Sequence, residues 1–279
     1  MKKFLARLIP RLYGFYFNVL SLFNRKKTAQ KAFDVFCTIR KGRITEKQKP
    51  YLDSAKMTVE NAAGHQVQLY HWPGKGDTVL LVHGWESNAF RWRNLIQKLQ
   101  DSDLNIIAFD APGHGNSSGH QLYVPLYSDC LQVLIEKYQP TYLVGHSVGG
   151  MTLLYNDYYH QNEHIEKMVT IGSPSEFKEI MANYQNILGF NGRVLAALDQ
   201  YIQKRFNMRI KDFSSSRFVQ NNTKKGLLFH DRFDAIAPYH ASEQVHSNWK
   251  NSTLVSTEGL GHSMHQSEVN DKIVSFLAS

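Results

Sequence analysis

The stretch "TYLVGHSVGGMTLL", from Thr141 to Leu154, joins an apolar run to a serine set among glycines. Its first residues suit a buried strand, and the residues after the glycines suit a helix. Gly145 and Gly149 lack the Cβ atoms that would clash where a strand doubles back into a helix. Ser147 would then stand in a strained turn at a helix N-terminus, whose N–H groups favour negative charge. Such a turn either serves ordinary packing or exposes the serine hydroxyl so that it can act as a nucleophile.

Short apolar runs alternate with amphipathic stretches from about Lys56 onward. Runs such as "TVLLV" and "NIIAF" are apolar on both faces, as in central parallel strands that helices cover. This alternation predicts an α/β protein with a doubly wound, mostly parallel sheet of eight strands and helices on both faces. The predicted strands are 57–60, 66–72, 78–82, 105–109, 141–145, 167–171, 226–229 and 253–256. The predicted helices are 88–99, 123–138, 148–160, 238–248 and 266–277.

One interval, between Gly172 and Gly226, breaks the alternation with about fifty residues of helical character and no convincing strand. Connections of that length are usually functional. We therefore expect a helical cap inserted at about residues 173–225 into a domain of residues 56–279. Residues 1–55 are expected to form a separate basic, amphipathic N-terminal extension.

The positive charge of the chain is concentrated near its N-terminus. Residues 1–50 contain thirteen Lys/Arg and two Asp/Glu, a net charge of +11, and the remaining residues carry a net charge of −3. A nucleic-acid enzyme would carry basic residues over its body instead, so no nucleic-acid partner is expected. Two cysteines outside any paired motif indicate a reducing compartment, and a cytoplasmic location is expected.

The N-terminal segment 1–27 has an apolar stripe with basic residues at its ends, formed by Phe4, Leu8, Leu12, Phe15, Val19 and Leu22. Its uncharged run is thirteen residues long, from Leu12 to Asn24, whereas a membrane span needs roughly 20. Pro10 is expected to bend or divide the helix. Two interpretations stay open: the segment lies on the inner face of an anionic membrane, or it packs on the body or on a second subunit.

Two glycine-containing segments follow other predicted strands. In "LLVHGWESN", His83-Gly84 turns the chain after Val82, so the N–H of Trp85 could meet the N–H of Val148 and form an oxyanion hole. The segment "FDAPGHGNSSG" follows the next strand, and we expect it to shape the site without taking part in chemistry. Asp110 at its start is interpreted as a structural residue.

The last third of the chain offers partners for a serine nucleophile. A serine hydroxyl is a weak nucleophile until a histidine takes its proton, and the histidine needs a carboxylate to orient it. "GLLFHDRFDAIAP" supplies Asp231 and Asp234, and "TLVSTEGLGHSMH" supplies His262. The carboxyl ends of parallel strands meet at one edge of a sheet, so these side chains could converge with Ser147.

These segments together resemble the α/β-hydrolase superfamily, in its esterase- and lipase-like serine hydrolase branch. The resemblance covers roughly residues 56–279 and rests on the order HG, DAPGHGNS, GHSVGG, an acid and a GH. It implies the α/β-hydrolase fold, with Ser147 as nucleophile, His262 as base and Asp234 as acid. Asp234 is preferred because D-A-I-A-P matches the acid followed by an apolar residue and proline; Asp231 then occupies a turn position. His83, Trp85 and His146 are candidate substrate-binding residues.

The function expected from these residues is hydrolysis of carboxylic esters through an acyl-enzyme, with a small-molecule ester or acyl substrate that could be lipid-like. An acyltransferase, thioesterase or aminopeptidase would use the same site. A non-catalytic ligand-binding protein could also keep the fold. No cofactor is expected, and no metal, because the pair His262 and His265 lacks a third ligand.

Overall fold

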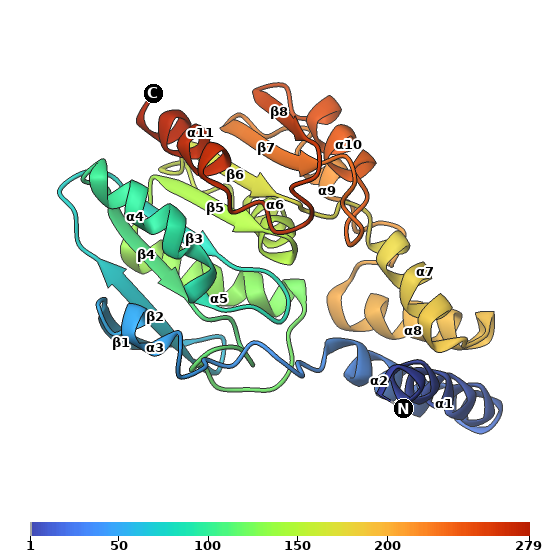
Figure 1. The fold of residues 1–279 in the computed structure, drawn as a ribbon. Coiled ribbons are helices and arrows are strands. Elements are labelled where there is room, and N and C mark those ends of the chain that lie inside the picture. The colour runs from blue at the N-terminus through green and yellow to red at the C-terminus, as the bar shows by residue number, and fades with distance from the viewer. Residues whose placement is uncertain (1) are drawn as a thin grey trace. The chain divides into compact units, whose positions relative to one another are not determined.

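The computed structural model describes residues 2–279, with side chains from Leu8 onward (Figure 1). The chain divides into two compact units. The cap unit contains the residues up to Thr38 together with Glu176–Ser214, and the sheet unit contains Ile39–Ser175 together with Ser215–Ser279. The extension expected over residues 1–55 is therefore divided: its residues up to Thr38 fold together with the cap, and its residues from Ile39 onward belong to the sheet unit.

The sheet unit is built on one eight-stranded sheet in the order β1-β2-β4-β3-β5-β6-β7-β8. Strand β2 runs antiparallel to both of its neighbours, and the six strands from β4 to β8 pair in parallel. The strands are β1 (Lys56–Ala62), β2 (His65–Trp72), β3 (Thr78–Val82), β4 (Asn105–Phe109), β5 (Tyr142–His146), β6 (Lys167–Ile171), β7 (Lys225–Asp231) and β8 (Ser252–Thr257). The predicted α/β fold and its eight strands are confirmed.

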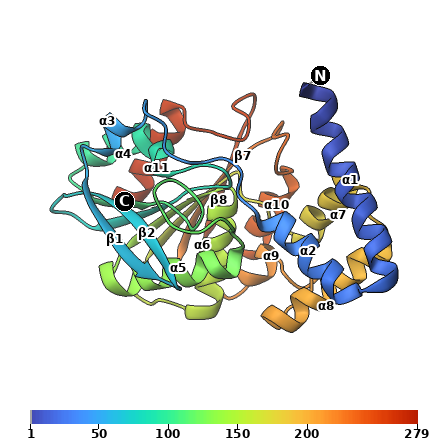
Figure 2. The ribbon, with the colours of Figure 1, turned by 90° about the horizontal axis from the view of Figure 1, so that it is seen from below.

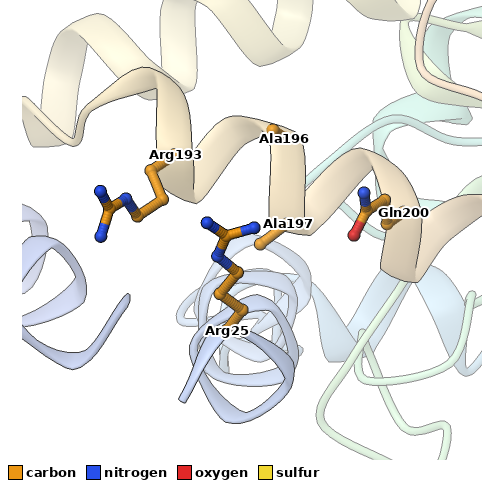
Figure 3. A pocket seen from close by; sticks show the side chains of 5 residues that line it. All are labelled: Arg25, Arg193, Ala196, Ala197 and Gln200. Carbon is orange, nitrogen blue, oxygen red and sulfur yellow. The ribbon is translucent and has the colours of Figure 1, made fainter. Parts of the chain in front are cut away.

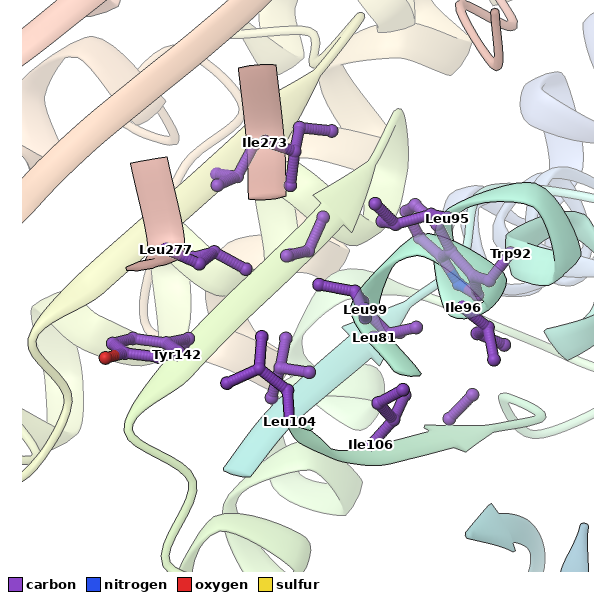
Figure 4. Close-up of a cluster of buried hydrophobic side chains, with 14 of the residues drawn as sticks. Leu81, Trp92, Leu95, Ile96, Leu99, Leu104, Ile106, Tyr142, Ile273 and Leu277 are labelled. Carbon is purple, nitrogen blue, oxygen red and sulfur yellow. The ribbon is translucent and has the colours of Figure 1, made fainter. Parts of the chain in front are cut away.

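Helices cover both faces of this sheet because successive strand residues point to opposite sides. In β3, Val79 and Leu81 pack with helices α4 (Arg93–Asp101) and α11 (Ser267–Ala278), as Figure 4 shows for Leu81. Leu80 and Val82 pack on the other face, with α5 (Val124–Tyr138), α6 (Val148–His160) and α10 (His240–Asn248). The short helices α3 (Lys49–Leu52), η1 (Ala89–Trp92) and α9 (Ser215–Phe218) complete the unit.

The cap unit consists of four helices, seen side by side in Figures 1 and 2: α1 (Lys2–Phe23), α2 (Arg25–Cys37), α7 (Phe177–Leu188) and α8 (Gly192–Phe206). Tyr184 of α7 donates from its hydroxyl to the carbonyl of Ala32 in α2, at 2.9 Å. Its ring packs against those of Phe36 and Phe190. Tyr184, Leu188 and Phe190 are buried, so these apolar cap residues form the core of the unit.

Helix α1 packs against α7 and α8 through small and polar residues. A Cβ atom on Gly14 would lie 1.9 Å from the carbonyl oxygen of Leu188, so only glycine allows this approach. Asn18 accepts from the N–H of Asn191 at 2.7 Å and donates to the carbonyl of Gly189. The sequence led us to expect that Pro10 bends or divides this helix; α1 is continuous across Pro10, so the proline does not divide it.

We expect Gly14→Ala to destabilise the cap unit, because the new methyl group would overlap a backbone carbonyl that cannot rotate away. Overpacking of this kind costs about 1–3 kcal/mol. Gly192→Ala is the matched control, since a Cβ atom there meets nothing within 4 Å. Hydrogen exchange of the α1 amides measures the effect; equal protection in the two variants would contradict the close contact.

Candidate active site

Ser147 lies between β5 and α6 in a backbone conformation that side chains rarely adopt, with φ of +53° and ψ of −124°. Its N–H donates to the carbonyl of Ile171 at 2.8 Å, which holds the turn in place. Cβ atoms on the flanking glycines would collide with backbone: Gly145 with Cα of Gly150 at 2.7 Å, and Gly149 with the carbonyl oxygen of Val82 at 2.2 Å. The strained turn predicted from the sequence is therefore present, and the glycines are what permit it.

A continuous hydrogen-bond chain connects Ser147, His262 and Asp234. His262 lies in the loop between β8 and α11, and its Nε2 is 3.0 Å from Oγ of Ser147. Its Nδ1 is 2.7 Å from Oδ2 of Asp234, which follows β7. The three side chains come from the carboxyl ends of β5, β7 and β8, as expected for a parallel sheet.

The side chain of Asp234 is fully buried and is held in its ionised form by its partners. Burial alone would raise the pKa of its carboxyl. Hydrogen bonds from His230 and His262 and from the backbone N–H groups of Ile236 and Ala237 outweigh this and lower the pKa well below its usual range. A carboxylate that stays charged can orient the imidazole of His262 and stabilise it when it is protonated.

Asp231 has a different environment from Asp234. Its carboxylate accepts from the N–H of Phe233 at 3.0 Å, the N–H of Leu260 at 2.8 Å and the hydroxyl of Thr257 at 2.9 Å. These bonds join the end of β7 to the loop that carries His262. The arrangement favours the interpretation of Asp231 as a turn residue.

His230 is a site residue that the sequence reasoning missed. It is fully buried, and its Nε2 lies 3.0 Å from the carbonyl oxygen of Ala237 and 3.5 Å from Oδ2 of Asp234. Its Nδ1 lies 2.6 Å from Oγ of Ser242, which can donate to it. With Ser242 as donor to Nδ1, the proton of His230 lies on Nε2, where it donates to the carbonyl of Ala237 and also faces the Asp234 carboxylate at 3.5 Å. No local motif marks His230, because its partner Ser242 lies on a separate helix.

Arg91 is a second residue that the sequence did not indicate. Its Nη2 donates to the carbonyl of Ser263 at 2.9 Å, one residue after His262. The contact steadies the loop that carries the imidazole.

Two histidines tie together the loops after β3 and β4. His83 accepts the N–H of Ala111 on Nε2 at 2.9 Å, and His114 accepts the N–H of Glu86 on Nε2 at 3.0 Å. Both rings are fully buried, which lowers the pKa of each, to about 4 for His114. Asp110 is also buried and accepts from the N–H of Ala89. The "FDAPGHGNSSG" segment therefore supports the β3 loop.

The β3 loop passes directly beside the serine. A Cβ atom on Gly84 would lie 3.0 Å from Cβ of Ser147 and 2.7 Å from Nδ1 of His146. In the described part of the chain, the backbone N–H groups of Trp85 and Val148 donate to no other group. They are therefore free to serve as the predicted oxyanion donors.

The three candidate substrate-binding residues differ in accessibility. The expected contact of the His83 side chain with substrate does not fit its position, since the ring is fully buried and both nitrogens face backbone groups, Gly84 O and Ala111 N–H. His146 is nearly buried, and its Nε2 lies 3.0 Å from the carbonyl oxygen of His262. Trp85 is half-buried, with its ring edge against His114.

No group of three His, Cys, Asp or Glu side chains among residues 8–279 is arranged to hold a metal ion. His262 has its two ring nitrogens directed at Ser147 and Asp234, so the pair His262 and His265 offers no ligand set.

Comparison with known families agrees with the fold. The family model described as alpha/beta hydrolase fold matches residues 77–194, and the model described as TAP-like protein matches residues 210–279. Among solved structures, the esterase Est1E from Butyrivibrio proteoclasticus, bound to ferulic acid, superposes with a TM-score of 0.65 at 18% identity, over 79% of this chain and 98% of that chain. An esterase from Exiguobacterium antarcticum superposes with a TM-score of 0.64 at 18% identity, over 80% of this chain and all of that chain. The chain belongs to the α/β-hydrolase superfamily.

Similar sequences include two esterases. A pimeloyl-[acyl-carrier protein] methyl ester esterase from Vibrio atlanticus is 29% identical over 146 residues, 52% of this chain and 54% of the relative. Protein phosphatase methylesterase 1 from Candida albicans is 33% identical over 103 residues, 34% of this chain and 29% of the relative. The matched regions thus span about half of the first relative and under a third of the second.

Because His83 and His114 are buried, we can predict how the free energy of unfolding depends on pH. Because burial lowers the pKa of His114 to about 4, while the pKa of an unfolded histidine is about 6.5, the unfolded state binds more protons between these values. Stability should therefore fall as the pH drops from about 6.5 to about 4, by about 1.4 kcal/mol per pH unit for this residue.

His114→Gln should reduce that slope by about the same amount. Urea unfolding from pH 7 to pH 4.5 measures it, with His120→Gln as the control for loss of an exposed imidazole. An unchanged slope in His114→Gln would show that His114 is not held neutral.

Proposed function

We propose that this chain is a serine hydrolase that cleaves carboxylic esters, with Ser147 as nucleophile, His262 as general base and acid, and Asp234 as the orienting carboxylate. The observation that carries the proposal is the hydrogen-bond chain of 3.0 and 2.7 Å through the two nitrogens of His262. The esterase names of the relatives support the same chemistry.

The reaction has two steps on the same residues. Nε2 of His262 takes the proton of Ser147 as Oγ attacks the acyl carbon, and Asp234 stabilises the resulting imidazolium. The N–H groups of Trp85 and Val148 donate to the oxyanion of the tetrahedral intermediate. The imidazolium then gives its proton to the departing alcohol, which leaves an acyl-enzyme. Water then attacks the acyl carbon while His262 takes its proton, and the imidazolium returns this proton to Oγ of Ser147 as the acyl–oxygen bond breaks, which releases the acid and restores the serine.

Methanol is the leaving group that the names of the relatives favour. Both named relatives are methyl ester hydrolases, although one acts on an acyl chain attached to a carrier protein and the other on a protein. We therefore expect methyl esters to be cleaved, and the acyl part to decide between substrates. Attack by Ser147 would also begin transfer to another alcohol, thioester cleavage and N-terminal peptide cleavage. The substrates tested therefore include one for each of these reactions.

We also propose a location at the inner face of a membrane, which the ester chemistry itself does not require. No helix among residues 2–279 has the length and apolar character to cross a bilayer. The contact we propose is peripheral and uses the N-terminal residues 1–27, whose apolar stripe has basic residues at its ends.

Ser147→Ala should abolish ester hydrolysis, lowering kcat by roughly 10⁴-fold or more because no other hydroxyl takes the place of Oγ. Hydrolysis is measured on methyl and p-nitrophenyl esters of increasing acyl length, with acyl thioesters, aminoacyl amides and an added alcohol acceptor in parallel. A fluorophosphonate probe should label the wild type and not the variant. Absence of labelling in both would instead favour a ligand-binding protein.

Replacement of the two neighbouring aspartates should separate their roles. Asp234→Asn should lower kcat by about 10⁴-fold, because the amide no longer stabilises the imidazolium. Asp231→Asn should lower the free energy of unfolding, since Asp231 holds the turn, with a much smaller effect on kcat. Urea unfolding and kcat are measured for both variants; the reverse pattern would reassign the acid to Asp231.

His230 should act as a positioning residue through Asp234. His230→Leu removes the buried donor, so the pKa of Asp234 should rise, kcat should fall by about 10- to 100-fold, and the acid limb of the pH–rate profile should move to higher pH. His230→Gln retains an N–H donor at a similar place and should restore much of the activity and the pH profile. Equal profiles in the two variants would indicate a packing role alone.

A further inference from the structure

The outer face of α1 is apolar and exposed. The stripe predicted from the sequence lies on this face from Leu8 onward, while Phe4 lies outside the residues whose side chains are described. Exposed fractions reach 69% for Phe15, 62% for Leu22 and 82% for Phe23. The other large exposed side chains of α1 are Leu8, Ile9, Leu12, Tyr13, Tyr16 and Val19. At 100° per residue this outer face covers roughly half of the helix circumference.

The inner face of α1 is made of small and polar residues together with one aromatic ring. Gly14, Phe17 and Ser21 are buried and recur at three- and four-residue steps. The packing against α7 and α8 uses this face, through the contact of Gly14 with Leu188. Amphipathic helices on protein surfaces normally bury their apolar stripe. In α1 the stripe points away from the unit, and an exposed apolar area of this extent marks an interaction surface.

The charge of the cap unit indicates what covers this surface. The unit contains 14 Lys/Arg and five Asp/Glu, a net charge of +9, whereas the sheet unit contains 18 and 19, a net charge of −1. Arg25, Lys26 and Lys27 follow the apolar face directly and are exposed. Arg25 of α2 and Arg193 of α8 line one hollow of the unit, shown in Figure 3. Exposed cations next to an exposed apolar helix face match the interface of an anionic membrane.

We propose that the outer face of α1 inserts into the interfacial layer of an anionic lipid bilayer, with Arg25 and its basic neighbours facing the headgroups. A second copy of the chain is a poorer occupant, because two units of charge +9 would repel each other when brought together. Asn18 and Gly14 fasten α1 to the turn between α7 and α8. Lipid binding therefore anchors the whole cap unit and not a loose terminal arm.

Flotation of the full chain with vesicles tests this binding. Vesicles of phosphatidylcholine mixed with phosphatidylserine should carry the protein, and vesicles of pure phosphatidylcholine should carry much less. Phe15→Ser with Leu22→Ser should lower partitioning by roughly ten-fold or more, because two apolar side chains no longer enter lipid. Both side chains are exposed, so the fold should be unaffected.

Matched controls separate the apolar and electrostatic contributions. Met57→Ser with Val59→Ser removes two exposed apolar side chains from β1 in the sheet unit and should leave flotation unchanged. Arg25→Gln with Arg193→Gln should weaken binding to anionic vesicles, whereas Lys56→Gln with Lys75→Gln in the sheet unit should weaken it less.

Equal flotation of wild type and Phe15→Ser/Leu22→Ser, or no flotation of either, would overturn the proposal. If instead the wild type does not float but forms a concentration-dependent dimer in light scattering, and only Phe15→Ser/Leu22→Ser disrupts that dimer, the outer face of α1 binds a second copy of the chain. Ester hydrolysis of soluble substrates does not require this face. A wild-type protein that hydrolyses esters but does not float would contradict membrane binding alone. A wild-type protein that floats but does not hydrolyse esters would contradict the proposed function alone.

Discussion

The close contact between the start of α6 and the end of β3 fixes the position of Ser147. Gly149 approaches the carbonyl of Val82 more closely than any side chain would allow, and Gly145 allows the same approach within its own turn. The strained conformation of Ser147 persists because packing on both sides leaves it no alternative. Any substitution that moves α6 away from β3 would therefore displace the hydroxyl from the reach of His262.

The other groups of the site are held by buried polar bonds and not by charge pairs on the surface. Asp231 joins the ends of β7 and β8, and His230 and His262 share the Asp234 carboxylate. His83 and His114 connect the loops after β3 and β4. Burial keeps these two imidazoles neutral, so each can accept a backbone N–H on one nitrogen. The same burial links the order of the site to pH, because the loops lose their partners if the rings are forced to charge.

The sheet and the central residues of the site could be predicted from the sequence because their signals are local. Strands such as β3 and β4 are apolar on both faces, and the environment of Ser147 is set by the glycines next to it. His230 could not be predicted in this way, since its role depends on Ser242 and on the path of the chain after β7. For α1 the periodicity identified the apolar face correctly but could not tell whether that face is covered. The small residues Gly14 and Ser21 on the opposite face indicate which side of α1 packs against its neighbours, because closely packed helices need small residues at their contacts.

The charge differs between the two units, so the proposed membrane-binding surface and the residues of the proposed ester chemistry lie in different units. The residues of the proposed ester chemistry all lie in the sheet unit, whose net charge is close to zero. The basic residues and the exposed apolar helix lie in the cap unit. A salt-screened attraction over about 10 Å brings a basic surface to an anionic bilayer, and apolar side chains then determine how long it stays. Phe15, Leu22 and Phe23 supply that second contribution, so raised salt should slow the arrival of the protein at lipid more than it speeds its release.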